Sequence, residues 1–262
     1  MNDIVHLFAP SRVITKRTFF LLCLGQGIVA VLLWTFATSP VVPKPLDIFR
    51  ALGELGETPD FFTDLATSTW LACQSVAITF VVSLLIVYAA VLPFFRPLAQ
   101  LVSKSRFLSL VGLSFVFTLA VSGGHELKVS LLVFGMTVFY VTSLLDVVDS
   151  IPRHEFHHAR TLGLSEWGVV REVVILGRID QAFELLRQNF AMAWMMLTLV
   201  EGISRTEGGI GALLLNQNKH LRLDSVFAIQ LTIFATGIVL DAVLGLLRRF
   251  FFPYSVLTKV VR

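Results

Sequence analysis

Long, continuously apolar runs constrain the fold of this chain most strongly. The stretch "TFFLLCLGQGIVAVLLWTFAT", residues 18–38, contains no charged residue, and about 20 apolar residues suffice for a helix to cross a bilayer. Spans in lipid are helices or closed barrels, and barrel strands alternate apolar and polar residues. These runs do not alternate, so we expect an all-α integral membrane protein. Its six expected spans are 18–38, about 68–92, 107–121, about 129–148, about 185–204 and about 225–247.

The composition agrees with this class and excludes others. Hydrophobic residues make up 55% of the 262 positions and charged residues 15%, against about 25% charged in soluble domains. The net charge is +3, but the basic residues flank the spans and form no single patch, so we expect no nucleic-acid partner. No GxxxxGK[ST] phosphate loop is present. We therefore expect no catalytic residue, no cofactor and no enzymatic activity on this chain.

The distribution of basic residues orients the spans. Six spans place both termini on one side, and that side has 14 of the 21 Lys and Arg residues, against six on the other. Cytoplasmic loops are enriched in Lys and Arg. We therefore expect cytoplasmic termini and a cytoplasmic stretch at about 149–181, in one domain covering 1–262.

Two other segments have a distinct expected form. After the first span, "PLDIFRALGEL" has Leu46, Phe49 and Leu52 at helical spacing, which predicts an amphipathic helix over about 45–56 at the periplasmic membrane surface. A basic loop, 93–106, precedes the third span. That span is short for a perpendicular crossing, so it begins within the loop or is an irregular, protein-buried helix.

The cytoplasmic stretch contains "EFHHARTLGLSEWGVVREVVIL", residues 155–176. Pro152 can begin a helix, with Ser150 as candidate cap, and Ser165 can cap a second helix. Gly163 between them permits a sharp turn. The predicted form is helix, turn, helix, with Ala159, Leu162 and Trp167 supplying apolar contacts.

The same stretch resembles the cytoplasmic EAA loop of ABC-importer permeases. Ala159 and Gly163 match the family pattern, whereas His157 stands in place of its Glu and Leu176 in place of its Pro. The resemblance implies ATPase-coupling roles for a short group of residues: His157, His158, Ala159, Leu162, Gly163 and Leu164.

Three other segments resemble the nitrate/sulfonate/taurine group of these permeases. They are "VVPKPLDIFRAL" after the first span, "LVEGISRTEGGIGALL" with Glu201, Gly209 and Gly211, and "GIVLDAVLGLLRRFFFPY" with Asp241. Glu201 is interpreted as a brace for the glycine-rich loop, and Asp241 as a structural residue with a charged partner.

The resemblance implies a type I importer permease in a bacterial-type inner membrane. Its implied partners are two ATPase subunits, which hold ATP and Mg, a second permease subunit in a homodimer or heterodimer, an extracytoplasmic solute-binding protein and membrane lipid. The solute would be small and polar or anionic. Candidate pathway residues are polar or aromatic side chains on the spans: Asn189, Trp194, Thr198, Gln74 and Tyr140.

Three alternatives are open from the sequence. The chain could be a self-contained secondary transporter or channel, although such proteins place coupling-ion sites near the midplane. It could also be a membrane scaffold without transport. His154, His157 and His158 have the spacing of a metal site on one helix face, but we interpret them as polar residues of a docking helix and expect no metal.

Overall fold

The computed structural model describes residues 15–36, 42–204 and 208–253. The described residues are helical, with no β-strand, as the continuous apolar runs predicted. The helices are α2 (Lys16–Phe36), α3 (Pro45–Glu57), α4 (Pro59–Ala89), α5 (Arg96–Lys104), η1 (Ser105–Phe107), α6 (Leu110–Ala120), α7 (Gly124–Asp149), α8 (Arg153–Thr161), α9 (Glu166–Val169), η2 (Val170–Ile175), η3 (Leu176–Arg178), α10 (Ile179–Ile203), α11 (Ile210–Lys219) and α12 (Leu223–Phe251).

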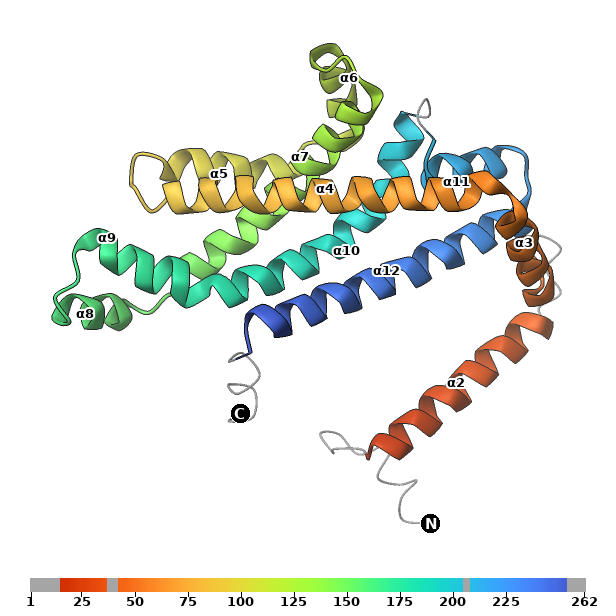
Figure 1. Ribbon diagram of the computed structural model, residues 1–262, viewed down its shortest axis with the longest axis horizontal. Coiled ribbons are helices and arrows are strands. Elements are labelled where there is room, and N and C mark those ends of the chain that lie inside the picture. Colours follow the sequence, from red (N-terminus) through yellow and green to blue (C-terminus); the bar gives the residue numbers. More distant parts are fainter. Residues whose placement is uncertain (1–14, 37–41, 205–207, 254–262) are drawn as a thin grey trace.

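Helices α4, α7, α10 and α12 form an elongated bundle (Figure 1). Helix α7 crosses between α4 and α10, and its buried face has Leu131, Met136 and Tyr140 in the core. The facing side of α4 has small hydroxyl residues, of which Thr79 and Ser83 are fully buried. Small side chains let membrane helices approach closely, which explains the extensive α4–α7 contact.

Six complete spans are not found in the described residues. Helices α2, α4, α7 and α12 are long and apolar enough to cross a membrane, and the bent pair α5–α6 raises the number from four to five. Helix α10 has the length expected of a span but is not apolar enough to be a candidate span, because its polar residues lower its hydropathy. These residues include Arg187, Gln188, Asn189 and Glu201.

The third predicted span is a broken helix. The chain bends by 115° between residues 96–107 and α6, so the expected loop at 93–106 is largely helical and the expected span 107–121 is an 11-residue helix. Only Ser114 of α6 is buried. Because the preceding helix is bent sharply from α6, a span that begins in the preceding segment stays a prediction.

Helix α3 confirms the predicted amphipathic helix and has a second apolar face that packs into the core. Ile48, Ala51 and Leu55 pack into the core, whereas Leu46 and Phe49 are exposed. Leu46 and Phe49, which the sequence places at helical spacing, lie on the exposed face. A membrane surface accommodates this exposed face.

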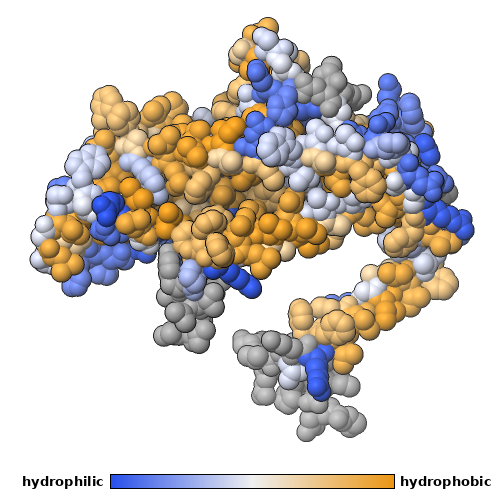
Figure 2. Space-filling model, viewed as in Figure 1, coloured by the Kyte–Doolittle hydropathy of each residue, from blue (hydrophilic) through white to orange (hydrophobic). Residues whose placement is uncertain are grey.

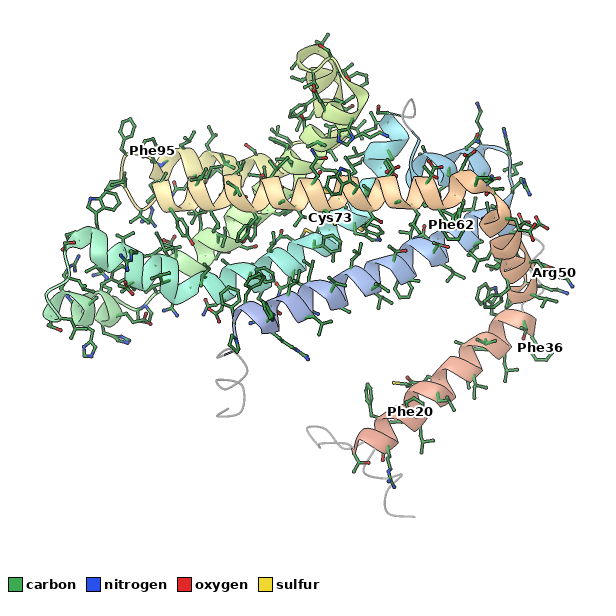
Figure 3. All side chains as sticks on the ribbon, in the orientation of Figure 1. Phe20, Phe36, Arg50, Phe62, Cys73 and Phe95 are labelled. Atoms are coloured by element: carbon green, nitrogen blue, oxygen red, sulfur yellow. The ribbon has the colours of Figure 1, made fainter. Side chains whose placement is uncertain are left out.

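Helix α2 extends away from the bundle and contacts α3 (Figure 1). None of its described side chains is buried, and Phe20 and Phe36 project into the surroundings (Figure 3). Hydrophobic residues cover the middle of the bundle, and hydrophilic residues gather at its two ends (Figure 2). This distribution is typical of a chain that crosses a bilayer.

Candidate functional site

The two short helices α8 and α9 form an elbow, residues 153–169, at one end of the bundle (Figure 1). Gly163 makes its turn with a φ of +77°. Its N–H donates to the Arg160 carbonyl at 3.0 Å, and a glycine in this left-handed conformation is a common way to end a helix. Ser165 begins α9, because its Oγ accepts a 3.2 Å hydrogen bond from the Gly168 N–H.

The N-terminal cap predicted for α8 is wrong. Pro152 occupies the cap position without a side-chain hydrogen bond. Ser150 instead ends α7 and donates to the carbonyl of Val147 at 2.7 Å. Ser150 precedes Pro152, whose fixed φ already suits the entry to a helix, so α8 begins without a side-chain cap.

The inner side of the elbow is fixed to the bundle. Ala159 is buried in a small apolar cluster with Val169, Val173 and Val174. Glu155 on α8 accepts two hydrogen bonds of 2.7 Å from Arg178, which lies directly before α10. Because this ion pair is partly buried, it joins the elbow mechanically to the base of α10.

The outer side of the elbow is exposed. Leu162 is 77% exposed and Trp167 is 66% exposed, so of the three residues expected to supply apolar contacts only Ala159 is buried within the chain. His157, His158 and Leu164 are also exposed. Of the predicted coupling residues, only Ala159 is buried, and the others lie at or near the turn where another molecule can reach them.

A charged pair closes the elbow across its turn. Arg160 donates from Nε and Nη2 to the two carboxylate oxygens of Glu166, each at 2.9 Å. The hydrogen bonds from Arg160 lower the pKa of Glu166 below its ordinary value. The pair bridges α8 and α9 at a fixed separation.

Glu201 lies at the other end of the bundle and holds the glycine-rich loop. It is fully buried, accepts a 2.5 Å hydrogen bond from the Ser68 hydroxyl, and accepts a 2.7 Å bond from the Gly211 N–H. Gly211 lies so close to α10 that a Cβ there would be 2.6 Å from the Cα of Thr198. Gly209, with a φ of +110°, donates from its N–H to Asp64 at 2.9 Å.

Sequence reasoning missed two members of this network. Lys128 is 98% buried in α7 and donates to the Gly208 carbonyl at 2.9 Å. Asp64 lies at the start of α4, 145 positions before the loop that it contacts. The sequence offered one signal: Lys128 and Asp64 are charged residues at the ends of apolar runs, and charged residues are rarely buried without a partner.

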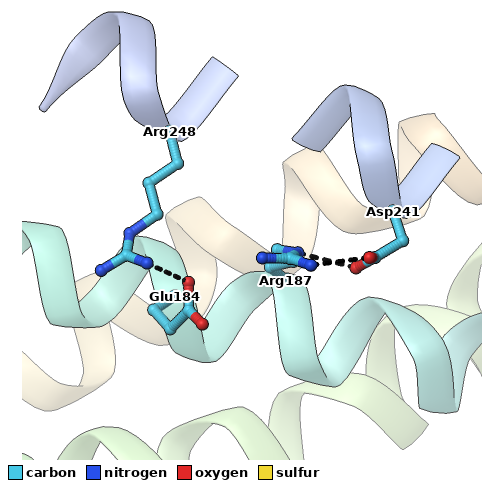
Figure 4. A network of polar contacts seen from close by, with 4 residues as sticks. All are labelled: Glu184, Arg187, Asp241 and Arg248. Atoms are coloured by element: carbon cyan, nitrogen blue, oxygen red, sulfur yellow. Dashed lines mark hydrogen bonds and ion pairs between the residues drawn. The ribbon is translucent and has the colours of Figure 1, made fainter. Parts of the chain in front are cut away.

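Ion pairs join α10 to α12 (Figure 4). Asp241 accepts two hydrogen bonds of 2.7 Å from Arg187, and Glu184 accepts one of 2.5 Å from Arg248. The expected charged partner of Asp241 is therefore Arg187 on α10. The membrane favours such pairing because an isolated charge in a span is costly.

The candidate pathway residues occupy different surroundings. Tyr140 and Trp194 are buried and donate to the carbonyls of Ala182 and Ile233, at 2.8 and 2.9 Å. Asn189 is buried and donates to Leu185 on its own helix at 2.9 Å. Thr198 is bonded within α10, and Gln74 contacts His125 at 3.0 Å. The structure brings Tyr140, Asn189 and Trp194 to the packed interface of α7, α10 and α12, and leaves Gln74 apart from them.

His154, His157 and His158 are exposed on α8. Within the described ranges, no group of three or more His, Cys, Asp or Glu residues is arranged to hold a metal ion. These histidines therefore present hydrogen-bonding groups at the surface of the elbow.

No protein-family model and no curated protein matches the sequence. Solved structures do match the fold. A chain of an amino acid ABC transporter solved with histidines aligns with a TM-score of 0.59 and 18% identity, over 76% of this chain and 96% of its own length. A chain of a bacterial ABC transporter involved in the import of the acidic polysaccharide alginate aligns with a TM-score of 0.61 and 13% identity, over 89% of this chain and 96% of its own.

This chain shares the fold of ABC importer permeases. The alignments cover almost the whole of both matched chains, so the similarity concerns the entire architecture rather than one helical pair. At these identities the likeness establishes the fold.

Proposed function

We propose that this chain is the transmembrane permease subunit of an ATP-driven importer, coupled to a separate ATPase through residues 155–176. One observation carries the proposal: the chain has the ABC permease fold and projects a rigid elbow with exposed apolar side chains from one end of its bundle. Soluble partners commonly bind such exposed apolar groups.

The elbow can transmit motion because it is connected to the bundle at defined points. Arg178 joins α8 to the base of α10, and the pairs Arg187–Asp241 and Glu184–Arg248 join α10 to α12. Glu201 then joins the far end of α10 to α4 and the glycine-rich loop. Movement of the elbow would therefore shift α10 and α12 together, in a change between two packed arrangements.

The assembly that we propose follows the type I importers. It contains two permease subunits, as a homodimer or heterodimer, two ATPase subunits that bind ATP and Mg, and an extracytoplasmic solute-binding protein. Six spans, cytoplasmic termini and an inner-membrane location belong to the same proposal. The solute is small and polar or anionic, as in the nitrate/sulfonate/taurine group, and Asn189, Trp194, Thr198, Gln74 and Tyr140 are the proposed pathway residues.

Purification from native membranes tests the proposal directly. The detergent-solubilised chain should carry a soluble ATPase with it, and ATP hydrolysis by the reconstituted complex should rise when the solute-binding protein is added with its solute. A chain that purifies without any ATPase and transports solute with an ion gradient would instead be a secondary transporter.

A further inference from the structure

We propose that the elbow binds a groove with two features on its partner: an apolar pocket that receives Leu162 and Trp167, and a border of carboxylates. This inference rests on the function proposed above, because the partner is the ATPase subunit. It specifies the chemistry of the partner's surface, which the family resemblance does not supply for an elbow with His157 in place of the family's Glu.

The apolar feature follows from exposure. Leu162 and Trp167 lie on either side of Gly163, and 77% and 66% of their surfaces are accessible. The neighbouring Ala159 and Val169 are buried, so the two large side chains project from a backbone that is itself anchored. A few residues that fill desolvated pockets carry most of the binding energy of a typical interface, and Trp is among the residue types most enriched there.

The charged feature follows from which groups already have partners. Each carboxylate of the elbow and the following turn is engaged by an arginine, in the pairs Glu155–Arg178, Glu166–Arg160 and Glu172–Arg171. Arg153 forms no ion pair within the described chain, and it is exposed beside the imidazoles of His154, His157 and His158. The outer face of α8 therefore offers cationic and N–H donor groups without free carboxylates, and acidic side chains complement it.

The elbow is held in one shape before any partner binds. The left-handed turn at Gly163, the two-bond Arg160–Glu166 pair and the buried cluster around Ala159 each restrict it. Such restriction strengthens binding because less freedom is lost on association. A bilayer has no fixed shape to match, whereas a protein groove does, so the rigid elbow favours a protein over the lipid surface.

Binding measurements with the reconstituted complex test both features. The chain is placed in nanodiscs, and the ATPase subunit that co-purifies with it is the probe. Trp167→Ala and Leu162→Ala should each weaken binding by about tenfold or more, and Trp167→Phe, which keeps an apolar ring, should bind nearly as the wild type does. Phe94→Ala is the matched control, since Phe94 is 83% exposed outside the elbow.

The charge of the border is tested separately. Arg153→Glu should weaken binding and flatten its dependence on salt concentration, because it places a carboxylate against carboxylates. Lys219→Glu makes the same charge change at an exposed residue of α11, at the opposite end of the bundle, and should have no effect. Equal binding by all elbow variants and the wild type would overturn the inference while the proposed function stands.

The lipid surface is the competing occupant, since Trp and Arg also favour headgroups. The difference in fluorescence between the wild type and Trp167→Phe gives the emission of Trp167 alone. In nanodiscs with brominated lipids, which quench a Trp that contacts the bilayer, this emission should not be quenched. Strong quenching would place the elbow on the bilayer and overturn the inference. Absence of any ATPase binding to the wild type would be a different result, because it removes the proposed function itself.

Discussion

At the scale of residues, Gly163 has the backbone conformation on which the elbow depends. Its φ is +77°, and a Cβ built there would meet no atom within 4 Å. The cost of substitution is therefore backbone strain, about 1–2 kcal/mol for an ordinary residue and more for a β-branched one. Gly163→Val should reduce solute uptake by about tenfold and uncouple it from ATP hydrolysis, without preventing membrane insertion.

Gly163→Asn is the matched variant, because Asn tolerates the left-handed conformation, and it should retain most uptake. Uptake and ATP hydrolysis are measured in proteoliposomes with equal amounts of each variant. Normal uptake by Gly163→Val would contradict a role for the turn in coupling.

The charged residues show what sequence reasoning can and cannot reach. Glu201 and Asp241 were identified because a charged residue in a membrane-spanning apolar run is energetically costly and therefore rare without a role. Their partners could not be identified, since Arg187 is 54 positions from Asp241 and Ser68 is 133 from Glu201. From the sequence alone, several polar or charged residues could be the partner of each carboxylate, and only the packing of the helices determines which one it contacts.

At the scale of elements, α10 and α12 are held together by paired charges. Arg187 and Asp241 are 33% and 46% exposed in the chain, and lipid rather than water surrounds much of the bundle. Asp241→Asn would leave Arg187 without its partner at the contact between α10 and α12, and an unpaired charge at membrane depth costs about 2–3 kcal/mol on membrane-insertion scales. The thermal stability of the complex in detergent should fall, and uptake should fall with it.

The exchanged pair Arg187→Asp with Asp241→Arg keeps both charges and should recover much of the lost stability and uptake. If the exchanged pair is as unstable as Asp241→Asn, the contact between the two side chains is not what stabilises α10 against α12.

The junction of α8 and α9 should respond to acid. Hydrogen bonds from Arg160 lower the pKa of Glu166 from its ordinary value of 4.5. A carboxyl with a lowered folded-state pKa stabilises the folded form above its ordinary pKa, and that contribution disappears as the pH falls through the lowered value. Protection of the elbow amides against hydrogen exchange should therefore decrease below about pH 4.5. Glu166→Gln should lack this pH dependence, and an identical decrease in that variant would contradict the assignment.

Element identity was easier to predict from sequence than element packing. Helix α3 was expected where it occurs, but the packing of Ile48, Ala51 and Leu55 into the core was not predicted, because apolar residues at helical spacing can face lipid or core. The bend before α6 was also missed. Both segments around it are apolar, so hydropathy alone gives no sign that the helix breaks at Leu108 and Ser109.

At the scale of the whole molecule, the two hydrophilic ends of the bundle differ in what they contain. The elbow occupies one end, and α3, α11 and the glycine-rich loop occupy the other (Figures 1 and 2). Coupling to a cytosolic ATPase requires the elbow to face the cytoplasm. The excess of Lys and Arg on that side predicts the same orientation, so the charge distribution and the proposed mechanism predict the same topology.

Labelling from each side of the membrane tests this topology. Thr161 and Lys219 are exposed at opposite ends of the bundle, and replacing Cys23 and Cys73 with Ser removes the native thiols. In that background, Thr161→Cys should react with an impermeant maleimide only in inverted vesicles, and Lys219→Cys only in intact cells with permeable outer membranes. The opposite pattern would place the elbow outside, where no ATPase could reach it. Reaction of Thr161→Cys from inside should also decrease when the ATPase is bound, because the partner then covers the turn next to Leu162.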